Sequence, residues 1–220
     1  MTSTVGIRIH RTTHVTPGRS ASTVPVIGVT GGVGSGKTLV AQHFVSWGAA
    51  LVSGDEIGRC VLDHSSTVRR RLARAFGSDI LNGDQVRRDI LADRAFASND
   101  SILALNSIVH PPLIRELNKQ VARLCRSGAH PAVVIDAALL AEWGVGRIHW
   151  DALVAVWAPQ RLRMKWMRKR GWSDREIRAR IRRQMPWTER RKLADFIVKN
   201  DSSLSVLKRR ARHCWEKIVS

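Results

Sequence analysis

The sequence predicts an α/β fold in which a parallel sheet is flanked by helices, with an inserted helical subdomain and an Arg-rich lid. From Val24 onward, short apolar runs alternate with helical patterns, which is typical of parallel strands joined by crossover helices. A glycine-rich turn follows the first apolar run and opens a helical pattern. The helical stretch between the second and third runs is too long for a simple crossover.

Five apolar runs are expected to form the sheet. Each is nearly continuous in apolar residues, as in strands that are buried on both faces. The candidate strands are residues 26–29, 50–52, 132–135, 153–156 and 196–198.

The long helical stretch covers about residues 56–128 and is punctuated at Gly77, Asn82-Gly83 and Pro111-Pro112. Glycine and proline interrupt regular structure, so several helices rather than one are expected. We interpret this stretch as a helical subdomain that binds the substrate.

A second helical segment, about residues 159–192, lies between the fourth and fifth candidate strands. Its basic residues occur almost without acids, and we interpret it as the lid. Within it, Ser173-Asp-Arg-Glu176 fits a capping box, and Ile177 with Ile181 gives the apolar spacing of the helix that follows.

The net charge is unusual. The chain of 220 residues has 37 Lys and Arg against 18 Asp and Glu, a formal charge of +19. A basic surface attracts nucleotides, nucleic acids and anionic membranes alike. Because charge alone carries no sequence readout, nucleic acid is not expected to be the main partner.

The cysteine pattern, the apolar stretches and the length of the chain also indicate its compartment and its number of domains. Cys60, Cys125 and Cys214 are far apart and form no C-x-x-C pair, which argues for a reducing compartment and against a disulfide framework or zinc site. No apolar stretch approaches the ~20 residues of a membrane span. A soluble, cytoplasmic protein is expected, with residues 1–23 a disordered extension and residues 24–220 one domain.

Residues 26–40 carry the most specific motif. Gly31, Gly36, Lys37 and Thr38 occupy the fixed positions of G-x-x-x-x-G-K-[ST], between a candidate strand and a helical pattern. Glycines let backbone N–H groups converge on a phosphate, and the helix N-terminus adds its dipole. The motif predicts a P-loop NTPase-type fold that binds a nucleoside triphosphate. The expected nucleotide-binding residues here are Gly32, Gly34, Ser35, Gly36, Lys37, Thr38 and Leu39.

Within this motif, Lys37 can reach the β- and γ-phosphates and the Thr38 hydroxyl can ligate Mg²⁺. A phosphate loop alone does not separate kinases from GTPases, motor ATPases or helicases. The short chain and the Arg-rich segment favour a small-molecule kinase, because a closing lid excludes water from phosphoryl transfer.

Asp55 follows the second candidate strand, where open α/β sheets bind ligands. A carboxylate there can accept a proton from an attacking hydroxyl. The alternative is that Asp55 only caps the helix that begins at Glu56.

Taken together, the motifs resemble those of dephospho-coenzyme A kinases over about residues 24–210. The matching segments are Ile27–Thr38, Trp47-Gly48-Ala49 followed by Asp55, Phe76-Gly77 with Ile80-Leu81, Arg88 with Leu91 and Phe96, Leu105–Pro111, Ile135–Glu142, Arg180-Ile181 with Gln184-Met185, and Ala194-Asp195 with Asn200. This resemblance implies phosphorylation of the ribose 3′-hydroxyl of dephospho-coenzyme A by ATP, the last step of coenzyme A biosynthesis.

The resemblance also implies roles for single residues. Asp55 and Lys37 would be catalytic, and Arg88 and His110 would place the acceptor nucleotide. Arg170, or its neighbour Arg168 or Lys169, would clamp phosphates from the lid. Asn200 would lie near the adenine. The open alternatives are that His110 merely caps or ends a helix before Pro111, and that Asp136 either holds Mg²⁺ through water or satisfies backbone donors.

The chain departs from the family pattern at four positions. Ser53 and Gly54 replace the first two residues of Asp-Ala-Asp, Ala138 replaces a proline, and Ala141 replaces a phenylalanine. Asp55 is retained, so an active kinase is expected. The alternatives are a related kinase with another hydroxyl acceptor, and a degenerate ATP-binding protein whose basic surface binds nucleic acid. The sequence indicates no oligomeric state.

Overall fold

The computed structural model describes residues 24–143 and 146–220, which form two compact units. The helical unit comprises Ser53–Lys119. The sheet unit comprises the described residues up to Val52 and those from Gln120 onward. The extension expected at residues 1–23 lies outside the described residues.

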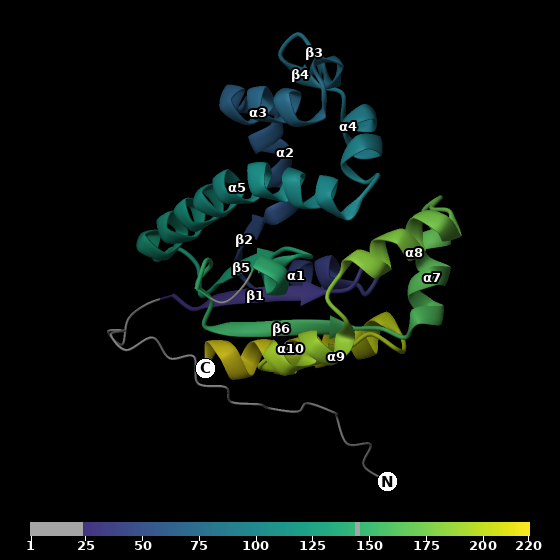
Figure 1. Ribbon diagram of the computed structural model, residues 1–220. Coiled ribbons are helices and arrows are strands. Elements are labelled where there is room, and N and C mark those ends of the chain that lie inside the picture. The colour runs from purple at the N-terminus through teal and green to yellow at the C-terminus, as the bar shows by residue number, and fades with distance from the viewer. Residues whose placement is uncertain (1–23, 144–145) are drawn as a thin grey trace. The chain divides into compact units, whose positions relative to one another are not determined.

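A five-stranded sheet in the order β2-β5-β1-β6-β7 organises the sheet unit (Figure 1). The strands are β1 Val26–Gly31, β2 Ala50–Ser53, β5 Val133–Asp136, β6 Ala152–Trp157 and β7 Phe196–Lys199. The central strand β1 pairs in parallel with β5 and β6, and β6 pairs in parallel with β7. The five predicted strands and the predicted parallel sheet are thus confirmed.

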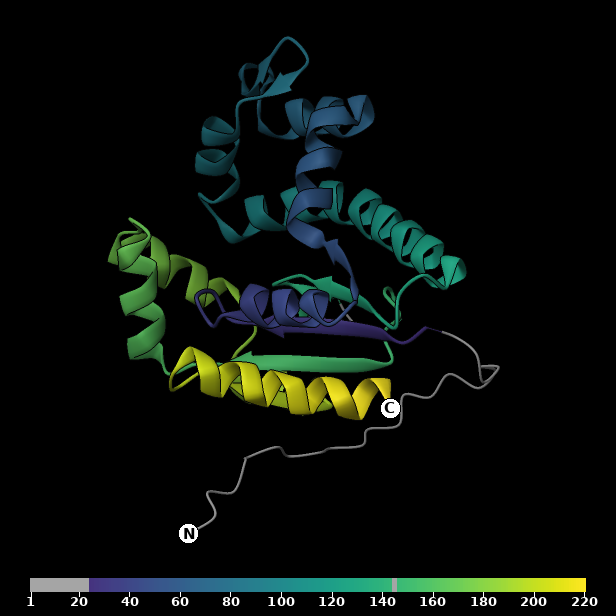
Figure 2. The same ribbon diagram turned by 180° about the vertical axis from the view of Figure 1, so that it is seen from behind.

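One face of the sheet is covered by α1 (Lys37–Ser46) and α10 (Leu204–Val219), which pack side by side (Figure 2). Phe44 of α1 and Trp215 of α10 place their ring centroids 5.6 Å apart. Both side chains belong to the cluster that also contains the inward residues of β1, β5 and β6. Because α1 carries the end of the phosphate loop, this packing fixes the helix that the loop enters.

Two short helices, α6 (Leu140–Trp143) and α9 (Trp187–Leu193), also pack against the central strands. Gly28 of β1 lies so close to α6 that a Cβ atom there would be 2.7 Å from Leu140 Cδ2. With helices on both faces, every residue of β1 is buried, which explains its continuous apolar sequence.

The Arg-rich segment forms α7 (Gln160–Lys169), α8 (Asp174–Arg183) and α9. Its first two helices stand beyond the carboxyl ends of β1 and β6 (Figure 1). The predicted capping box is confirmed: the Ser173 side chain accepts from the Glu176 N–H, and the Glu176 carboxylate accepts from the Ser173 N–H.

The helical unit contains four α-helices, the short 3-10 helix η1 and a small hairpin. Their bounds are α2 Gly54–His64, α3 Ser66–Phe76, η1 Ser78–Ile80, β3 Leu81–Asn82, β4 Gln85–Val86, α4 Arg88–Ala95 and α5 Asn99–Ser127, the last continuing into the sheet unit. The punctuation at Asn82-Gly83 marks the β3–β4 hairpin: Asn82 ends β3 and Gly83 begins the turn. The predicted helical stretch did not include these strands.

The break expected at Pro111-Pro112 is wrong, because α5 runs through both prolines. A proline inside a helix removes a hydrogen bond and costs about 3 kcal/mol. The helix instead gains from burial of the side chains that follow the prolines at helical spacing, Leu113, Leu117 and Val121. Although α5 has 29 residues, no helix within the described residues is both long and apolar enough to cross a membrane.

Truncation of Trp215 to Ala is expected to lower the free energy of unfolding by about 3–5 kcal/mol, because it leaves a cavity between α10 and α1. Trp215 is only 6% exposed. The neighbouring Glu216→Ala, which removes only an exposed i,i+4 pair with Arg212, is the control and should cost less than about 0.5 kcal/mol. Urea denaturation of both variants provides the comparison, and equal losses would contradict this account of the core.

Candidate active site

The phosphate loop forms a tight turn between β1 and α1. The Ser35 N–H donates to the Gly32 carbonyl at 2.9 Å, and Gly34 between them has φ of +73°. Gly36, the residue before α1, has φ of +91°. Glycine is favoured where φ is positive, so the backbone path explains the glycines at positions 34 and 36.

Helix α7 covers the first half of the loop. A Cβ atom on Gly32 would lie 2.7 Å from an Arg163 guanidinium nitrogen, and one on Gly34 would lie 2.9 Å from Met167 Cγ. The Arg163 Nε donates to the Val33 carbonyl at 2.8 Å, and Gln184 Oε1 accepts from the Val33 N–H at 2.7 Å. Burial, together with the positive charge of Arg190, lowers the pKa of Arg163 from its ordinary value.

Asn200 holds the second half of the loop. Its side chain is buried, and its Nδ2 donates to the Ser35 carbonyl at 2.9 Å. A Cβ atom on Gly36 would lie 2.4 Å from the same nitrogen. Asn200 is therefore a support of the phosphate loop, and its contact with the adenine stays a prediction.

Lys37 and Asp136 form the charged centre of the loop. Lys37 Nζ lies 2.9 Å from Asp136 Oδ1 and 3.3 Å from the Thr38 hydroxyl. Asp136 ends β5, which pairs with β1, so the sheet brings the carboxylate to the loop. Neither alternative considered for Asp136 included this ion pair with Lys37.

A buried arginine lies beneath the loop. Arg190 of α9 is 1% exposed; its Nη2 lies 2.6 Å from Glu142 Oε1, and its Nη1 donates to the Thr30 hydroxyl and to the Ala138 carbonyl. Glu142 also accepts from the Met185 N–H at 2.9 Å. This network ties β1, α6 and the end of α8 together through one cation.

The predicted acceptor-side residues belong to the helical unit. Asp55 is exposed in the first turn of α2. The alternative that Asp55 caps this helix is wrong, because Ser53 is the N-cap and its side chain accepts from the Glu56 N–H at 3.2 Å. Ser53, one of the departures from the family pattern, thus has a capping role that serine and aspartate both fill.

Arg88 begins α4 and pairs with α2. Its Nη2 donates to both carboxylate oxygens of Asp63, at 2.7 and 2.8 Å. This hydrogen bond lowers the pKa of the Asp63 carboxyl below its ordinary value. Both side chains are about half exposed, at 47% and 44%, so the guanidinium is accessible to an anionic ligand.

His110 lies inside α5, which continues to Ser127. The alternative that it caps or ends a helix is therefore wrong. Arg170 is exposed at the end of α7, whereas its neighbour Arg168 forms a two-point ion pair with Asp174 at 2.6 and 2.7 Å. Of these two arginines, Arg170 is therefore the better placed to take a phosphate.

Comparison with known proteins agrees with this geometry. Residues 25–205 match the sequence profile of dephospho-CoA kinases. The chain belongs to the dephospho-CoA kinase family. It is 36% identical over 197 residues to the dephospho-CoA kinase of Corynebacterium diphtheriae, which covers 89% of this chain and 98% of the relative. It is 35% identical to the dephospho-CoA kinase of Carboxydothermus hydrogenoformans, over 82% of this chain and 88% of that relative.

Solved structures show the same fold. A crystal structure of a Thermus thermophilus protein has a TM-score of 0.73 and 32% identity, covering 88% of this chain and 97% of the other. The dephospho-CoA kinase of Campylobacter jejuni has a TM-score of 0.59 and 22% identity, over 88% of this chain and 97% of the other. This similarity supports the fold alone. The predicted family and its kinase activity in coenzyme A biosynthesis are thereby confirmed.

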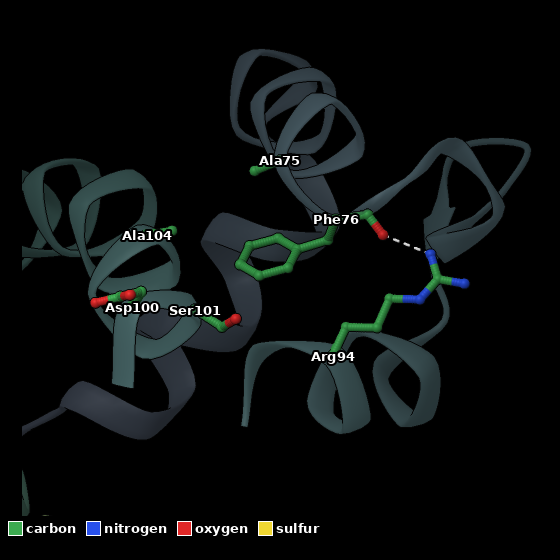
Figure 3. Close-up of a pocket in the computed structure, with 6 residues that line it drawn as sticks. All are labelled: Ala75, Phe76, Arg94, Asp100, Ser101 and Ala104. Atoms are coloured by element: carbon green, nitrogen blue, oxygen red, sulfur yellow. Dashed lines mark hydrogen bonds between the residues drawn. The ribbon is translucent and has the colours of Figure 1, made fainter. Parts of the chain in front are cut away.

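The helical unit of this kinase also contains a cavity of about 500 Å³ (Figure 3). The Phe76 ring points into it, and the Arg94 side chain lies at its edge. Arg94 is already engaged, since its guanidinium donates to the Phe76 carbonyl and to both oxygens of Asp79 at 2.5–2.6 Å. The remaining lining residues are Ala75, Asp100, Ser101 and Ala104.

Three residues had no role predicted from the sequence: Arg163 and Gln184, which bond to Val33 of the loop, and Arg190, which bonds to Thr30 of β1. Gln184 belongs to a segment that resembles the family, which was a signal that it matters without showing how. Arg163 and Arg190 occur among many other arginines, and nothing local separates them. Only their burial and their hydrogen-bond partners in the structure distinguish them from the other arginines.

Asn200→Ala is expected to weaken ATP binding about fivefold to tenfold and to destabilise the protein by about 1–3 kcal/mol, because the buried Ser35 carbonyl loses its donor. Asn200→Asp should be at least as damaging at neutral pH, since a carboxylate oxygen would face that carbonyl. Calorimetric titration with ATP and urea denaturation measure both effects. Wild-type affinity in either variant would exclude a supporting role for Asn200.

Glu142→Gln is expected to cost about 3–5 kcal/mol of stability, because it leaves the buried Arg190 cation without its counter-ion. Glu189→Gln is the matched control: its partner Lys192 is exposed, so the loss should be under about 1 kcal/mol. The double variant Glu142→Leu/Arg190→Met should recover part of the loss. The denaturation midpoints of the three variants measure these losses. If the double variant recovers no stability, the loss in Glu142→Gln does not come from the unpaired charge of Arg190.

Proposed function

We propose that this kinase transfers the γ-phosphoryl group of ATP to the ribose 3′-hydroxyl of dephospho-coenzyme A, with the roles of its residues as follows. The observation that carries the proposal is the supported phosphate loop. In the sheet unit, Arg163 and Gln184 contact Val33, Asn200 contacts Ser35, and Asp136 contacts Lys37. Such a preorganised loop presents backbone N–H groups from Gly34 to Leu39 to a triphosphate.

Lys37 is proposed to exchange its partner when ATP binds. In the structure its ammonium group pairs with Asp136, and a β- or γ-phosphate oxygen can take the place of that carboxylate. This exchange leaves Asp136 and the Thr38 hydroxyl as two hard oxygen donors at one side of the phosphates, a donor set that suits Mg²⁺. Bound there, the ion would neutralise charge on the phosphate oxygens.

The described residues contain no separate group of three or more His, Cys, Asp or Glu side chains that could hold a metal. A site completed by phosphate oxygens fits that finding, because Mg²⁺ in kinases is commonly bound by one or two protein ligands together with the nucleotide.

Asp55 is the proposed general base. Its carboxylate takes the proton of the 3′-hydroxyl as the oxygen–phosphorus bond to the acceptor forms and the bond between the γ-phosphorus and the β–γ bridging oxygen breaks, releasing ADP. Arg88 and His110 are proposed to hold the acceptor nucleotide, and Arg170 to clamp phosphates. Asn200 is proposed to lie near the adenine in addition to supporting the loop.

We also propose a cytoplasmic setting, as the cysteine pattern predicts. Cys60, Cys125 and Cys214 form no disulfide in the part of the chain that the structure describes, which is consistent with a reducing compartment.

Asp55→Asn is expected to lower kcat by about 10²–10⁴-fold while leaving the KM for ATP within about threefold, because it removes the proton acceptor and no phosphate contact. Glu56→Gln, an adjacent exposed acid on the same helix, should retain activity. The measurement is ADP release from Mg-ATP with and without dephospho-coenzyme A.

Turnover that survives in Asp55→Asn would reassign Asp55 to positioning and keep the reaction. ATP binding without any acceptor-dependent ADP in the wild type would contradict the proposed acceptor. A panel of small hydroxyl acceptors would then test for a related kinase activity, and a salt-dependent gel shift with short nucleic acids would test for a binding protein.

A further inference from the structure

Val33 is the loop residue whose backbone is held from both sides by the Arg-rich segment. Its N–H donates to Gln184 Oε1 at 2.7 Å, and its carbonyl accepts from Arg163 Nε at 2.8 Å. We propose that Gln184 is a positioning residue for ATP: together with Arg163 it sets the orientation of the two peptide groups that flank Val33. This inference rests on the proposed function.

Glycines on both sides make this control necessary. Gly32 and Gly34 leave the flanking dihedral angles nearly unrestricted, so either peptide group could rotate in the absence of a fixed partner. Rotation of the Gly32–Val33 peptide would break the turn in which the Gly32 carbonyl accepts from the Ser35 N–H. Rotation of the Val33–Gly34 peptide would direct the Val33 carbonyl, in place of the Gly34 N–H, toward a bound phosphate. Electrostatic repulsion of the phosphate would follow.

The two contacts determine where the opposite ends of these peptide groups point. In a trans peptide the N–H and the C=O point in opposite directions. Because Gln184 takes the Val33 N–H, the Gly32 carbonyl points the other way, into the turn, where it accepts from the Ser35 N–H at 2.9 Å. Because Arg163 takes the Val33 carbonyl, the Gly34 N–H points away from α7.

The two contacts to Val33, from Gln184 and from Arg163, form a clamp that is itself anchored. The Val33 side chain packs against the cluster of Met164, Met167 and Ile177 from α7 and α8. Gln184 is the C-cap of α8, and the next residue, Met185, donates its N–H to Glu142, which pairs with the buried Arg190. The acceptor oxygen of Gln184 is thus held by a network that continues into the core of the sheet unit.

These contacts give the Arg-rich segment a second role. Besides its predicted role as a lid, it forms the support against which the first half of the phosphate loop takes its shape. Loss of the Gln184 contact should therefore impair recognition of the β- and γ-phosphates, whereas binding of the acceptor in the helical unit should be unaffected.

Gln184→Met tests this inference, because methionine keeps the approximate volume and removes the amide oxygen. We expect the Kd and KM for Mg-ATP to rise about tenfold, as for a partly buried N–H left without an acceptor. The KM for dephospho-coenzyme A should stay within about twofold, and the Kd for AMP, which lacks the β- and γ-phosphates, should change less than that for ATP. Gln184→Asn, whose shorter side chain withdraws the oxygen, should act in the same direction.

Gln160→Met is the matched control, since Gln160 is exposed at the start of α7; it should behave as wild type. Unchanged ATP affinity in Gln184→Met, or equal increases in the KM of both substrates, would overturn the inference. Calorimetric titration with ATP needs no acceptor. A selective loss of ATP affinity in a protein that does not phosphorylate dephospho-coenzyme A would therefore refute the proposed function and leave the clamp standing.

Discussion

The structure depends on the support of a glycine-rich backbone by side chains that are distant in sequence. Glycines are needed in the phosphate loop because a Cβ atom on Gly32, Gly34 or Gly36 would collide with neighbouring side chains. The same glycines leave the backbone without conformational preference. Contacts from α7, from the C-cap of α8 and from Asn200 supply the missing restraint.

Charge is used in two ways around this loop. Lys37 and Asp136 form a pair whose side chains are only 14% and 8% exposed, and the proposed function has a triphosphate reorganise it. Arg190 is fully buried, pairs with the partly exposed Glu142 and donates further hydrogen bonds to Thr30 and Ala138, so this pair is structural. A buried cation is tolerated only when its donors are satisfied, which explains why α6, α9 and β1 meet at this side chain.

The departures from the family pattern are compatible with this arrangement. Ser53 caps α2 through its hydroxyl, so the turn before Asp55 keeps a capping side chain without the acid. Ala138, where the family has proline, offers its carbonyl to Arg190. Neither position requires the family residue for the contact seen here.

The sequence by itself determined the features that depend on neighbours along the chain. The five strands, the glycine positions of the loop and the capping box at Ser173 follow from local periodicity and backbone geometry, and all three were predicted correctly. The tertiary structure alone decided the partners of Lys37, Val33 and Arg190, as well as the continuation of α5 through Pro111 and Pro112. Gln184 lies 151 residues from Val33, and no local pattern specifies such a contact, because its geometry exists only after the sheet has brought both segments together.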